Sequence, residues 1–399
     1  MRVNSSELPS LLRRITNMDQ YIDRVRGIIN DVKEHGDEAL LRLTSELDGV
    51  RLSSIELSSS ELMALASNIE PRVKEALDEA VASVESFNNR IKPSNIEDYY
   101  RGLRRGVRWV PLSRVGLYVP KGYFSTLVMT GVLAKAAGVE ELIAVTPPRR
   151  DGLIDPETAY VALRLNARVF RVGGAQAVAA LAFGTESVPK VDKIAGPGNV
   201  YVQAAKLLVS NYVGIDGVEG PTELVTCADP SIKPITVALD LAAQLEHAGA
   251  VGVLATWNEG YLTAIEEELS KLTNSPYLST LINGPSECVD LINELAPEHA
   301  SIWGFELPID GIRNAGAVSI MAPSALVDYI AGPSHVLPTG GSARWRGVLT
   351  PMDFMKPIAY IEPTSKTEAG RLSELGAILG LREGFRRHSE ALVNWINEE

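Results

Sequence analysis

Two pairs of residues in this chain could bind a metal or move protons. Gln244 and His247 are three residues apart in a helix-like stretch, so an amide oxygen and an imidazole would share one helix face, as metal ligands require. The alternative is a helix-end histidine near carbonyl oxygens, with Gln244 on a solvated face. Glu298 and His299 follow a proline that favours a helix end, and they supply two proton-transfer groups near neutral pH. The alternative is an acidic–basic pair on the surface.

Three further residues are candidates because of their surroundings. Asp328 follows the apolar pair Leu326-Val327, and it is either a buried ligand or the cap of the next turn. His335 lies in a loop rich in Gly and Pro, where nothing requires an apolar environment. His388 follows two arginines near the C-terminus, a pattern that also fits an exposed histidine on a helix.

The two cysteines, Cys227 and Cys288, are too few for a disulfide framework or a CxxC metal site. Their scarcity favours a reducing cytosol. Cys227 lies in the apolar segment ELVTCAD. It could be the thiol of an aldehyde-oxidising enzyme, although a cysteine inside an apolar strand is more often an inert part of the core.

The elements that must position these residues alternate along the chain. Short apolar segments at 142–147, 167–173 and 191–198 are typical of buried strands, and helix-like stretches separate them. A second such series runs from 222 to about 321. Repeated strand, turn and helix predict an α/β fold: two doubly wound, incomplete Rossmann-like parallel-sheet domains with small helical additions at the N- and C-termini.

Two glycine-rich turns follow expected strands, at Gly173-Gly174 and at Gly196-Pro197-Gly198. The carboxyl ends of parallel strands are where ligands bind in such folds. Neither turn completes GxGxxG, and no Walker A loop occurs. The glycines therefore indicate either a phosphate-binding site or only tight turns.

The composition excludes several classes of protein. The formal net charge of −12 disfavours general binding to nucleic acids or anionic membranes. The arginines between Arg101 and Arg114 lack an accompanying aromatic series, so we interpret them as a solvated face. There is no stretch of signal-peptide type and no apolar run long enough to span a bilayer. We expect a cytoplasmic protein.

Several long blocks, in order, resemble the L-histidinol dehydrogenase family over residues 20–395. They are GLYVPKG, VFRVGGAQAVAALAFGTESVPKVDKIAGPGNVYVQAAK, EGPTELV, QLEH, ELAPEHA, DYIAGPSHVLPTGG and EGFRRH. The resemblance implies a homodimeric zinc enzyme of histidine biosynthesis. Such an enzyme oxidises L-histidinol to L-histidine through a bound aldehyde, with two NAD per turnover.

The resemblance also implies roles for particular residues. The acid–base pair would be Glu298 and His299. The remaining roles fall into three sets: one zinc per subunit on Gln244, His247, Asp328 and the other subunit's His388; NAD on Tyr118, Gln176 and Asn199; and substrate on Thr222, His335 and Glu383, together with the zinc ligands and His299.

The expected domains follow from these roles. They are an N-terminal helical arm over 1–20, a first α/β domain over 21–117 and 222–345 with the metal and acid–base residues, an NAD-binding α/β domain over 118–221, and a helical tail over 346–399 that contributes to the partner subunit's site. Their total of 399 residues at 43.1 kDa suits two or three domains.

The sequence departs from the family's pattern in four places. Thr222 replaces a usual serine, Lys121 a glycine, and Ser334 an asparagine. The segment Ser324–Val327 lacks the usual Pro-Glu and Gly before Asp328. The change at Thr222 keeps open a dehydrogenase of the same family acting on another small amino-alcohol or a sulfonated diol. Two further alternatives are a zinc hydrolase, since a metal with Glu and His nearby can activate water, and a non-enzymatic dinucleotide-binding module.

Overall fold

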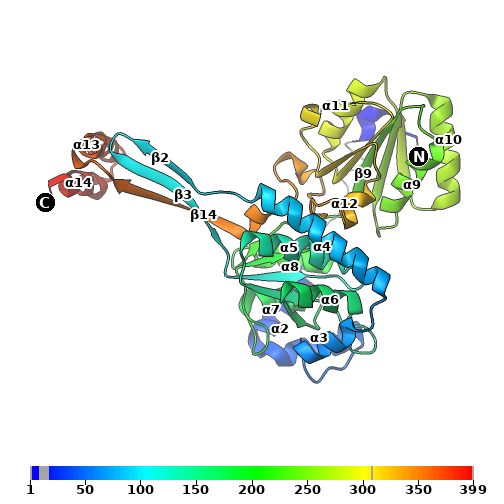
Figure 1. Ribbon diagram of the computed structural model, residues 1–399, viewed down its shortest axis with the longest axis horizontal. Coiled ribbons are helices and arrows are strands. Elements are labelled where there is room, and N and C mark those ends of the chain that lie inside the picture. The colour runs from blue at the N-terminus through cyan, green and yellow to red at the C-terminus, as the bar shows by residue number, and fades with distance from the viewer. Residues whose placement is uncertain (1, 9–17, 307–308, 398–399) are drawn as a thin grey trace. The chain divides into compact units, whose positions relative to one another are not determined.

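The computed structural model describes residues 2–8, 18–306 and 309–397 (Figure 1). Half of the expected N-terminal arm, residues 1 and 9–17, lies outside these residues. Within the described part of that arm, Ser5–Glu7 form one 3-10 turn, η1. The chain divides into two compact units: Met1–Ile91 with Leu112–Phe354, and Lys92–Pro111 with Met355–Glu399.

The first unit contains a six-stranded sheet in the order β1-β6-β5-β4-β7-β8. All neighbouring strands are parallel except β1, which runs antiparallel to β6. The order reverses direction at β4, as it does in doubly wound sheets. The strands are β1 (Glu56–Leu57), β4 (Arg114–Tyr118), β5 (Glu141–Val145), β6 (Arg168–Phe170), β7 (Lys193–Ala195) and β8 (Gly214–Ile215).

Seven helices belong to this sheet among the residues that the structure describes. They are α2 (Asp19–Leu43), α3 (Ser59–Ala66), α4 (Pro71–Ile91), α5 (Ser125–Ala137), α6 (Pro156–Leu165), α7 (Gly174–Phe183) and α8 (Val200–Val209). A π-helical turn, η2 (Thr44–Asp48), continues α2. The middle of α7 is buried on every side, because its sequence is almost entirely alanine, valine and leucine.

The packing of α2, α3 and α4 differs from the expected domain boundaries, which grouped residues 21–117 with the later sheet. In the structure, α2 contacts α7 and α8, α3 contacts α6, and α4 contacts α5. The reason is the apolar stripe of α2, where Val25, Ile29 and Val32 join the buried cluster that also contains α7. The N-terminal helices therefore complete the six-stranded sheet.

A second sheet of the same unit has five parallel strands in the order β11-β10-β9-β12-β13. Its elements are β9 (Glu223–Ala228), α9 (Pro234–Gln244), β10 (Val251–Thr256), α10 (Glu259–Leu272), β11 (Tyr277–Leu281), α11 (Pro285–Leu295), β12 (His299–Trp303), β13 (Ala317–Ile320) and α12 (Ala325–Tyr329). The expected α/β class with parallel sheets is confirmed.

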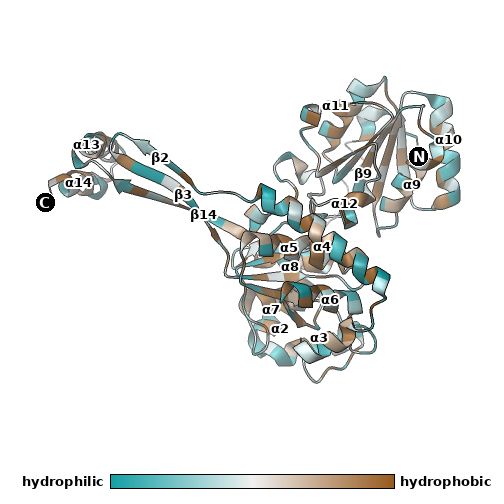
Figure 2. Cartoon of the chain, viewed as in Figure 1, coloured by the Kyte–Doolittle hydropathy of each residue, from teal (hydrophilic) through white to brown (hydrophobic). Residues whose placement is uncertain are grey.

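Helices cover both faces of this second sheet. Leu224 and Leu254 pack in one cluster with α9 and α10, whereas Val225 and Val253 pack in another with α11. Successive residues of a strand point to opposite faces, so this division follows from the sequence of each strand. The hydropathy colours show the apolar strands and the hydrophilic outer side of α10 (Figure 2).

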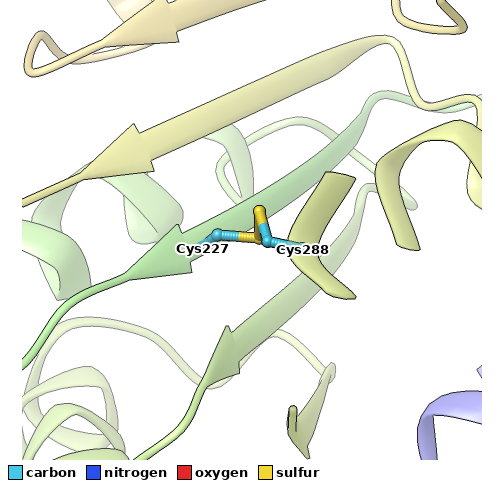
Figure 3. The surroundings of a disulfide bond; sticks show 2 residues. All are labelled: Cys227 and Cys288. Carbon is cyan, nitrogen blue, oxygen red and sulfur yellow. A yellow bond between two sulfur atoms is a disulfide. The ribbon is translucent and has the colours of Figure 1, made fainter. Parts of the chain in front are cut away.

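Cys227 and Cys288 form a disulfide, with their Cα atoms 6.2 Å apart (Figure 3). The bond joins β9 to α11 on the α11 face of the sheet. The expectation of two reduced thiols is therefore wrong. Tertiary folding brings together two cysteines separated by 61 residues, which the spacing alone could not indicate.

The second unit is a three-stranded antiparallel sheet followed by two helices. Its elements are β2 (Ile96–Tyr100), β3 (Leu103–Pro111), β14 (Met355–Pro363), α13 (Lys366–Arg382) and α14 (Arg386–Asn394), with the strand order β14-β3-β2. The tail thus begins with a strand, although the sequence predicted a helical end only. Arg104 pairs with Glu97 and Glu362, and Arg105 with Asp98, which agrees with a solvated arginine face.

Short 3-10 turns occur outside these sheets at η3 (Ile309–Gly311), η4 (Ser342–Arg344), η5 (Pro351–Phe354) and η6 (Trp395–Asn397). Over the described ranges, no helix combines the length and apolar character needed to cross a bilayer.

Candidate active site

The candidate acid–base pair, Glu298 and His299, lies at the amino end of the second sheet. His299 is the first residue of β12 and is 2% exposed. Glu298 precedes it, after α11 has ended at Ala296 in the left-handed region (φ 51°). The carboxylate oxygen Oε2 of Glu298 accepts a hydrogen bond of 3.1 Å from the backbone N–H of Glu223. The pair is thus held by the first residues of two neighbouring strands, and the hypothesis of a surface dipeptide is wrong.

Asp328, on the short helix α12, contacts two other candidate residues. Its Oδ2 accepts a hydrogen bond of 2.7 Å from Nε2 of Gln244, and its Oδ1 lies 3.4 Å from Nε2 of His299. Asp328 therefore joins the end of α9 to the start of β12. It is a member of a buried polar cluster and not merely a cap.

Two further histidines lie beside this cluster. Nδ1 of His335 is 2.9 Å from the backbone carbonyl oxygen of Asp328, and its Nε2 is buried without a hydrogen-bond partner. His247 follows α9, and its ring stacks on Tyr123 with 6.5 Å between centroids. The loops after β4 and α9 therefore meet at this stack.

Burial and the neighbouring charges shift the pKa values of the residues in this cluster. Burial raises the pKa of Glu298 to about 8, against the opposing effects of His299 and of the backbone N–H of Glu223. Burial also raises the pKa of Asp328, but His299 and Gln244 outweigh this effect and hold it below its ordinary value. For His299, burial lowers the pKa, yet the surrounding carboxylates raise it overall. Burial lowers the pKa of His335.

Gln244 has a side-chain atom that could bind a metal ion. Its Oε1 is buried and has no hydrogen-bond partner, while its Nε2 is fully engaged. Among the described residues, no three His, Cys, Asp or Glu side chains gather as a metal site. The expected zinc ligands include only two such side chains from the first unit, His247 and Asp328. The other two ligands are the amide of Gln244 and His388, which belongs to the second unit.

The remaining candidates for substrate or metal binding lie apart in the chain. Thr222 directly precedes β9, and its carbonyl oxygen accepts a hydrogen bond of 2.8 Å from the N–H of Val251. Glu383 and His388 belong to the second unit, at the end of α13 and in α14, and both are exposed. The ring of His388 lies edge-on to Phe385, with 5.1 Å between centroids.

The three candidate NAD contacts line one cavity of about 300 Å³ beside the first sheet. Tyr118 ends β4, and its hydroxyl oxygen accepts a hydrogen bond of 3.0 Å from the N–H of Gly174 at the start of α7. Gln176 has a buried Oε1 without a partner. Asn199 caps α8 by accepting hydrogen bonds from the N–H groups of Tyr201 and Val202. Two helix N-termini therefore meet at this cavity, which is a favourable place for phosphate groups.

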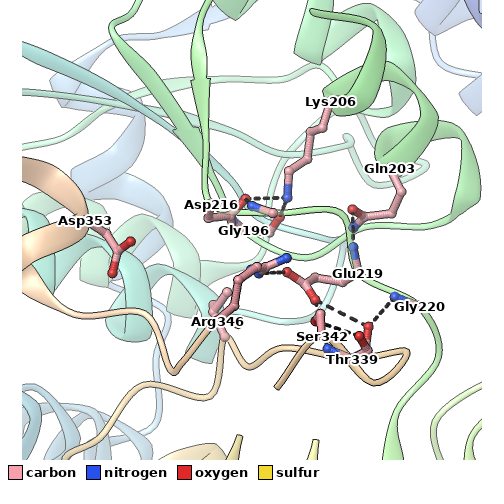
Figure 4. Close-up of polar contacts among 12 residues, drawn as sticks. Gly196, Gln203, Lys206, Asp216, Glu219, Gly220, Thr339, Ser342, Arg346 and Asp353 are labelled. Carbon is pink, nitrogen blue, oxygen red and sulfur yellow. Dashed lines mark hydrogen bonds and ion pairs between the residues drawn. The ribbon is translucent and has the colours of Figure 1, made fainter. Parts of the chain in front are cut away.

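A buried ion pair supports the second of the glycine turns. Lys206 and Asp216 are 2.5 Å apart and at most 1% exposed (Figure 4). Lys206 donates to the carbonyl oxygen of Gly196 at 3.1 Å, and Asp216 accepts from its N–H at 2.7 Å. A Cβ atom at Gly196 would lie 2.1 Å from the carbonyl oxygen of Tyr118, so this position requires glycine.

Four polar residues around the two candidate sites were given no role from the sequence. Asp240 and Ser324 contact Gln244 directly or through each other, and Glu223 holds Glu298. Asp48, whose Oδ2 is buried without a partner, lines the cavity with Tyr118. Asp240 had a usable signal, because it lies one helical turn before Gln244 in an otherwise apolar stretch.

The fold and the two candidate sites together indicate the general class of the protein. Two parallel sheets with their helices make this an α/β protein, with a cavity at strand ends beside two helix N-termini and a separate buried Glu–His pair. A likeness to a putative aldehyde dehydrogenase from Anabaena variabilis, with a TM-score of 0.51 and 12% identity, concerns the fold alone.

Comparisons with known proteins are more specific. Residues 11–394 match the family described as histidinol dehydrogenase. A histidinol dehydrogenase of Saccharolobus solfataricus is 43% identical over 97% of this chain and 98% of that protein, and one of Pyrobaculum aerophilum is 40% identical over 94% and 98%. The crystal structure of histidinol dehydrogenase from Elizabethkingia anophelis has a TM-score of 0.89 and 29% identity, covering 94% of this chain and 93% of that chain. The chain belongs to the histidinol dehydrogenase family.

Proposed function

We propose that this protein is a cytoplasmic, NAD-dependent enzyme that oxidises L-histidinol to L-histidine in two steps through bound L-histidinaldehyde, the last steps of histidine biosynthesis. Membership of the family supports histidinol oxidation. The observation that carries the proposal is the position of Asp328, in contact with both Gln244 and His299. Two candidate zinc ligands, Gln244 and Asp328, thereby lie next to the candidate base His299.

Gln244, His247 and Asp328 would hold one Zn²⁺ per subunit, together with His388 of the partner subunit. The buried, unpartnered Oε1 of Gln244 suits this role, and zinc accepts such oxygen and nitrogen ligands. When bound, zinc would orient the amine and imidazole of histidinol and would offset the negative charge of Asp328.

His299 would act as the base in the first oxidation. Its Nε2 faces the carboxylate of Asp328, so in the neutral imidazole Nε2 carries the proton and Nδ1 is the acceptor. That Nδ1 is buried without a partner and is therefore free to take the proton of the substrate hydroxyl. NAD would accept the hydride in each step.

Glu298 would serve the second oxidation. A carboxyl with a pKa of about 8 is a stronger base than an ordinary glutamate once it is ionised, and it can take a proton from the water that attacks the aldehyde. His299 would then assist oxidation of the hydrate. Thr222, His335 and Glu383 would contact the substrate, and the free Nε2 of His335 offers one such contact.

The NAD site would be the cavity that Tyr118, Gln176 and Asn199 line. Residues at the N-termini of α7 and α8 line this cavity, so the positive ends of the two helix dipoles would favour the pyrophosphate there. This site replaces the GxGxxG turn that the sequence lacks.

The functional assembly would be a homodimer in which each tail completes the partner's site. The second unit supports this proposal, since its helices expose a series of large apolar side chains. They are Leu375, Ile378, Leu379, Leu381, Phe385 and Val393. Apolar surface of this kind is typical of a protein–protein contact.

One assay tests the proposed function: zinc content of the purified protein and the yield of NADH per histidinol consumed. Two NADH per histidinol, one zinc per subunit and histidine as product are expected. A yield of one, or turnover only with another amino-alcohol or a sulfonated diol, would support the alternative dehydrogenase, to which the methyl group of Thr222 in place of a usual serine points. Hydrolysis without nicotinamide would support a zinc hydrolase.

A further inference from the structure

Asp240 and Ser324 form a buried polar contact behind Gln244. Asp240 lies one turn before Gln244 on α9 and is 3% exposed, and Ser324 is fully buried. Oδ1 of Asp240 accepts hydrogen bonds from the backbone N–H of Ser324 at 2.7 Å and from its hydroxyl at 2.8 Å. Oδ2 accepts a third from the indole N–H of Trp303 at 3.1 Å.

The directions of these hydrogen bonds follow from the groups involved. Backbone and indole N–H groups can only donate, so both oxygens of Asp240 act as acceptors. The hydroxyl proton of Ser324 must therefore point at Asp240. Its oxygen is left as an acceptor, and it receives a hydrogen bond of 3.1 Å from Nε2 of Gln244.

The orientation of the Gln244 amide is then determined. One proton of its NH2 group is bound by Ser324 and the other by Asp328, so its NH2 group cannot exchange places with Oε1 without losing both bonds. Oε1 is the atom that remains buried and unpartnered. A glutamine that rotated by 180° would present an NH2 group, which cannot bind a cation.

We propose that Asp240 and Ser324 are positioning residues that hold the Gln244 amide with its carbonyl oxygen toward a divalent cation. The proposal rests on the proposed function and extends it to residues that touch neither metal nor substrate. Groups that orient a metal ligand by hydrogen bonding commonly change metal affinity by about 10- to 100-fold when removed.

A purely structural role must be separated from a positioning role, because Asp240 also joins α9 to β12 and α12. Asp240→Leu removes the acceptor for the Ser324 hydroxyl and lets its proton turn toward Gln244. Asp240→Asn keeps its oxygen as the acceptor for Ser324 if its NH2 group faces Trp303. In that orientation the NH2 group opposes only the indole N–H, whereas the reverse orientation would place it against both donors of Ser324. The double variant D240N/W303F removes even that opposing donor and is the matched control.

The first measurement is the dissociation constant for Zn²⁺ of the full-length protein, by competition with a chromogenic chelator. Asp240→Leu and the milder Ser324→Ala should bind zinc about 10- to 100-fold more weakly. D240N/W303F should bind zinc as the parent does, although its melting temperature should fall. Equal zinc affinity in all four proteins, or losses that simply follow the melting temperature, would overturn the proposal.

A sharper test is whether the effect of Asp240→Leu on zinc affinity changes sign in a second background. In a Gln244→Glu background, the new carboxylate has no proton to give to Ser324, whose own proton points at Asp240. Adding Asp240→Leu frees that proton for the carboxylate, so zinc affinity should rise there although the same change lowers it in the parent. A loss in both backgrounds would contradict the proposed role, since a general structural effect has one sign.

A second measurement does not depend on metal. The side-chain NH2 protons of Gln244, labelled with ¹⁵N-glutamine and assigned by their loss in Gln244→Glu, should exchange slowly in the parent and faster in Ser324→Ala. Fast exchange in the parent refutes the proposal. If the exchange is slow but the parent binds no zinc, the proposed function fails while the fixed orientation of the amide stands.

Discussion

The carboxylate of Glu298 accepts a hydrogen bond from the backbone N–H of Glu223, so the first residue of β9 holds the carboxyl group that precedes β12. The side chain of Glu223 is itself buried, and burial raises its pKa to about 7. Two carboxyl groups with elevated pKa values thus lie next to each other at the amino end of this sheet. This contact positions Glu298, whereas its raised pKa comes from burial, which outweighs the lowering effect of the Glu223 N–H.

Glu298→Gln should keep the first oxidation and stall the second, because the amide cannot take a proton from water. We expect overall turnover to histidine to fall by about 10²- to 10⁴-fold, with histidinaldehyde trapped as an adduct in place of histidine. Glu294→Gln, at an exposed position on α11, is the control and should not change the product. If both oxidations fall equally, the role given to Glu298 is wrong.

The raised pKa of Glu298 predicts the pH dependence of the second oxidation. The rate from histidinaldehyde should increase as pH rises through about 8, where the carboxyl becomes the ionised base. The free energy of unfolding should decrease as pH rises, because a carboxyl whose pKa is raised by folding stabilises the folded state while it is protonated. The free energy of unfolding should therefore fall between about pH 4.5, the unfolded value, and about pH 8. Glu298→Gln should flatten this part of the curve of melting temperature against pH.

Removing one partner of the buried pair Lys206–Asp216 should disturb the turn at Gly196. Lys206→Met leaves a buried carboxylate without its cation and should destabilise the protein by about 3–5 kcal/mol. At temperatures where the variant is folded, the KM for NAD should rise more than kcat falls. Lys271→Met, which removes a largely exposed pair with Glu268, should cost under about 1 kcal/mol and leave that KM unchanged.

The disulfide should contribute to stability and not to catalysis. Closing a loop of 61 residues restricts the unfolded chain, and the chain-entropy estimate for it is about 4 kcal/mol. C227A/C288A should have a lower melting temperature that no longer responds to reductant, while turnover per folded molecule should be retained. Loss of turnover would instead support the hypothesis that Cys227 is a catalytic thiol.

His388→Asn mixed with Glu298→Gln tests whether subunits share their sites. Each parent should be inactive in forming histidine, but a heterodimer would contain one site with both native residues. Dissociation and reassociation of the mixture should therefore restore up to about a quarter of the native activity, the share expected from random pairing of two sites. Mixtures that stay inactive would show that each tail serves its own subunit.

The sequence by itself determined the alternation of strands and helices and the α/β class. Its apolar segments carry these features locally, as in the strands from β5 to β7 and the helices between them. It also singled out Gln244 by its spacing from His247, Glu298 and His299 as adjacent proton-transfer groups, and Asp328 by the apolar pair before it. The resemblance of long blocks to one family supplied the expected ligands.

Only the tertiary structure decided which of these residues meet. The contact of Asp328 with His299, the disulfide of Cys227 with Cys288, and the strand pairing of β3 with β14 join segments far apart in the chain. α2 packs beside α7 because its apolar stripe fits there, a choice that its periodicity could not specify. Local patterns fix what an element is, whereas burial and hydrogen bonding between distant elements fix where each side chain points.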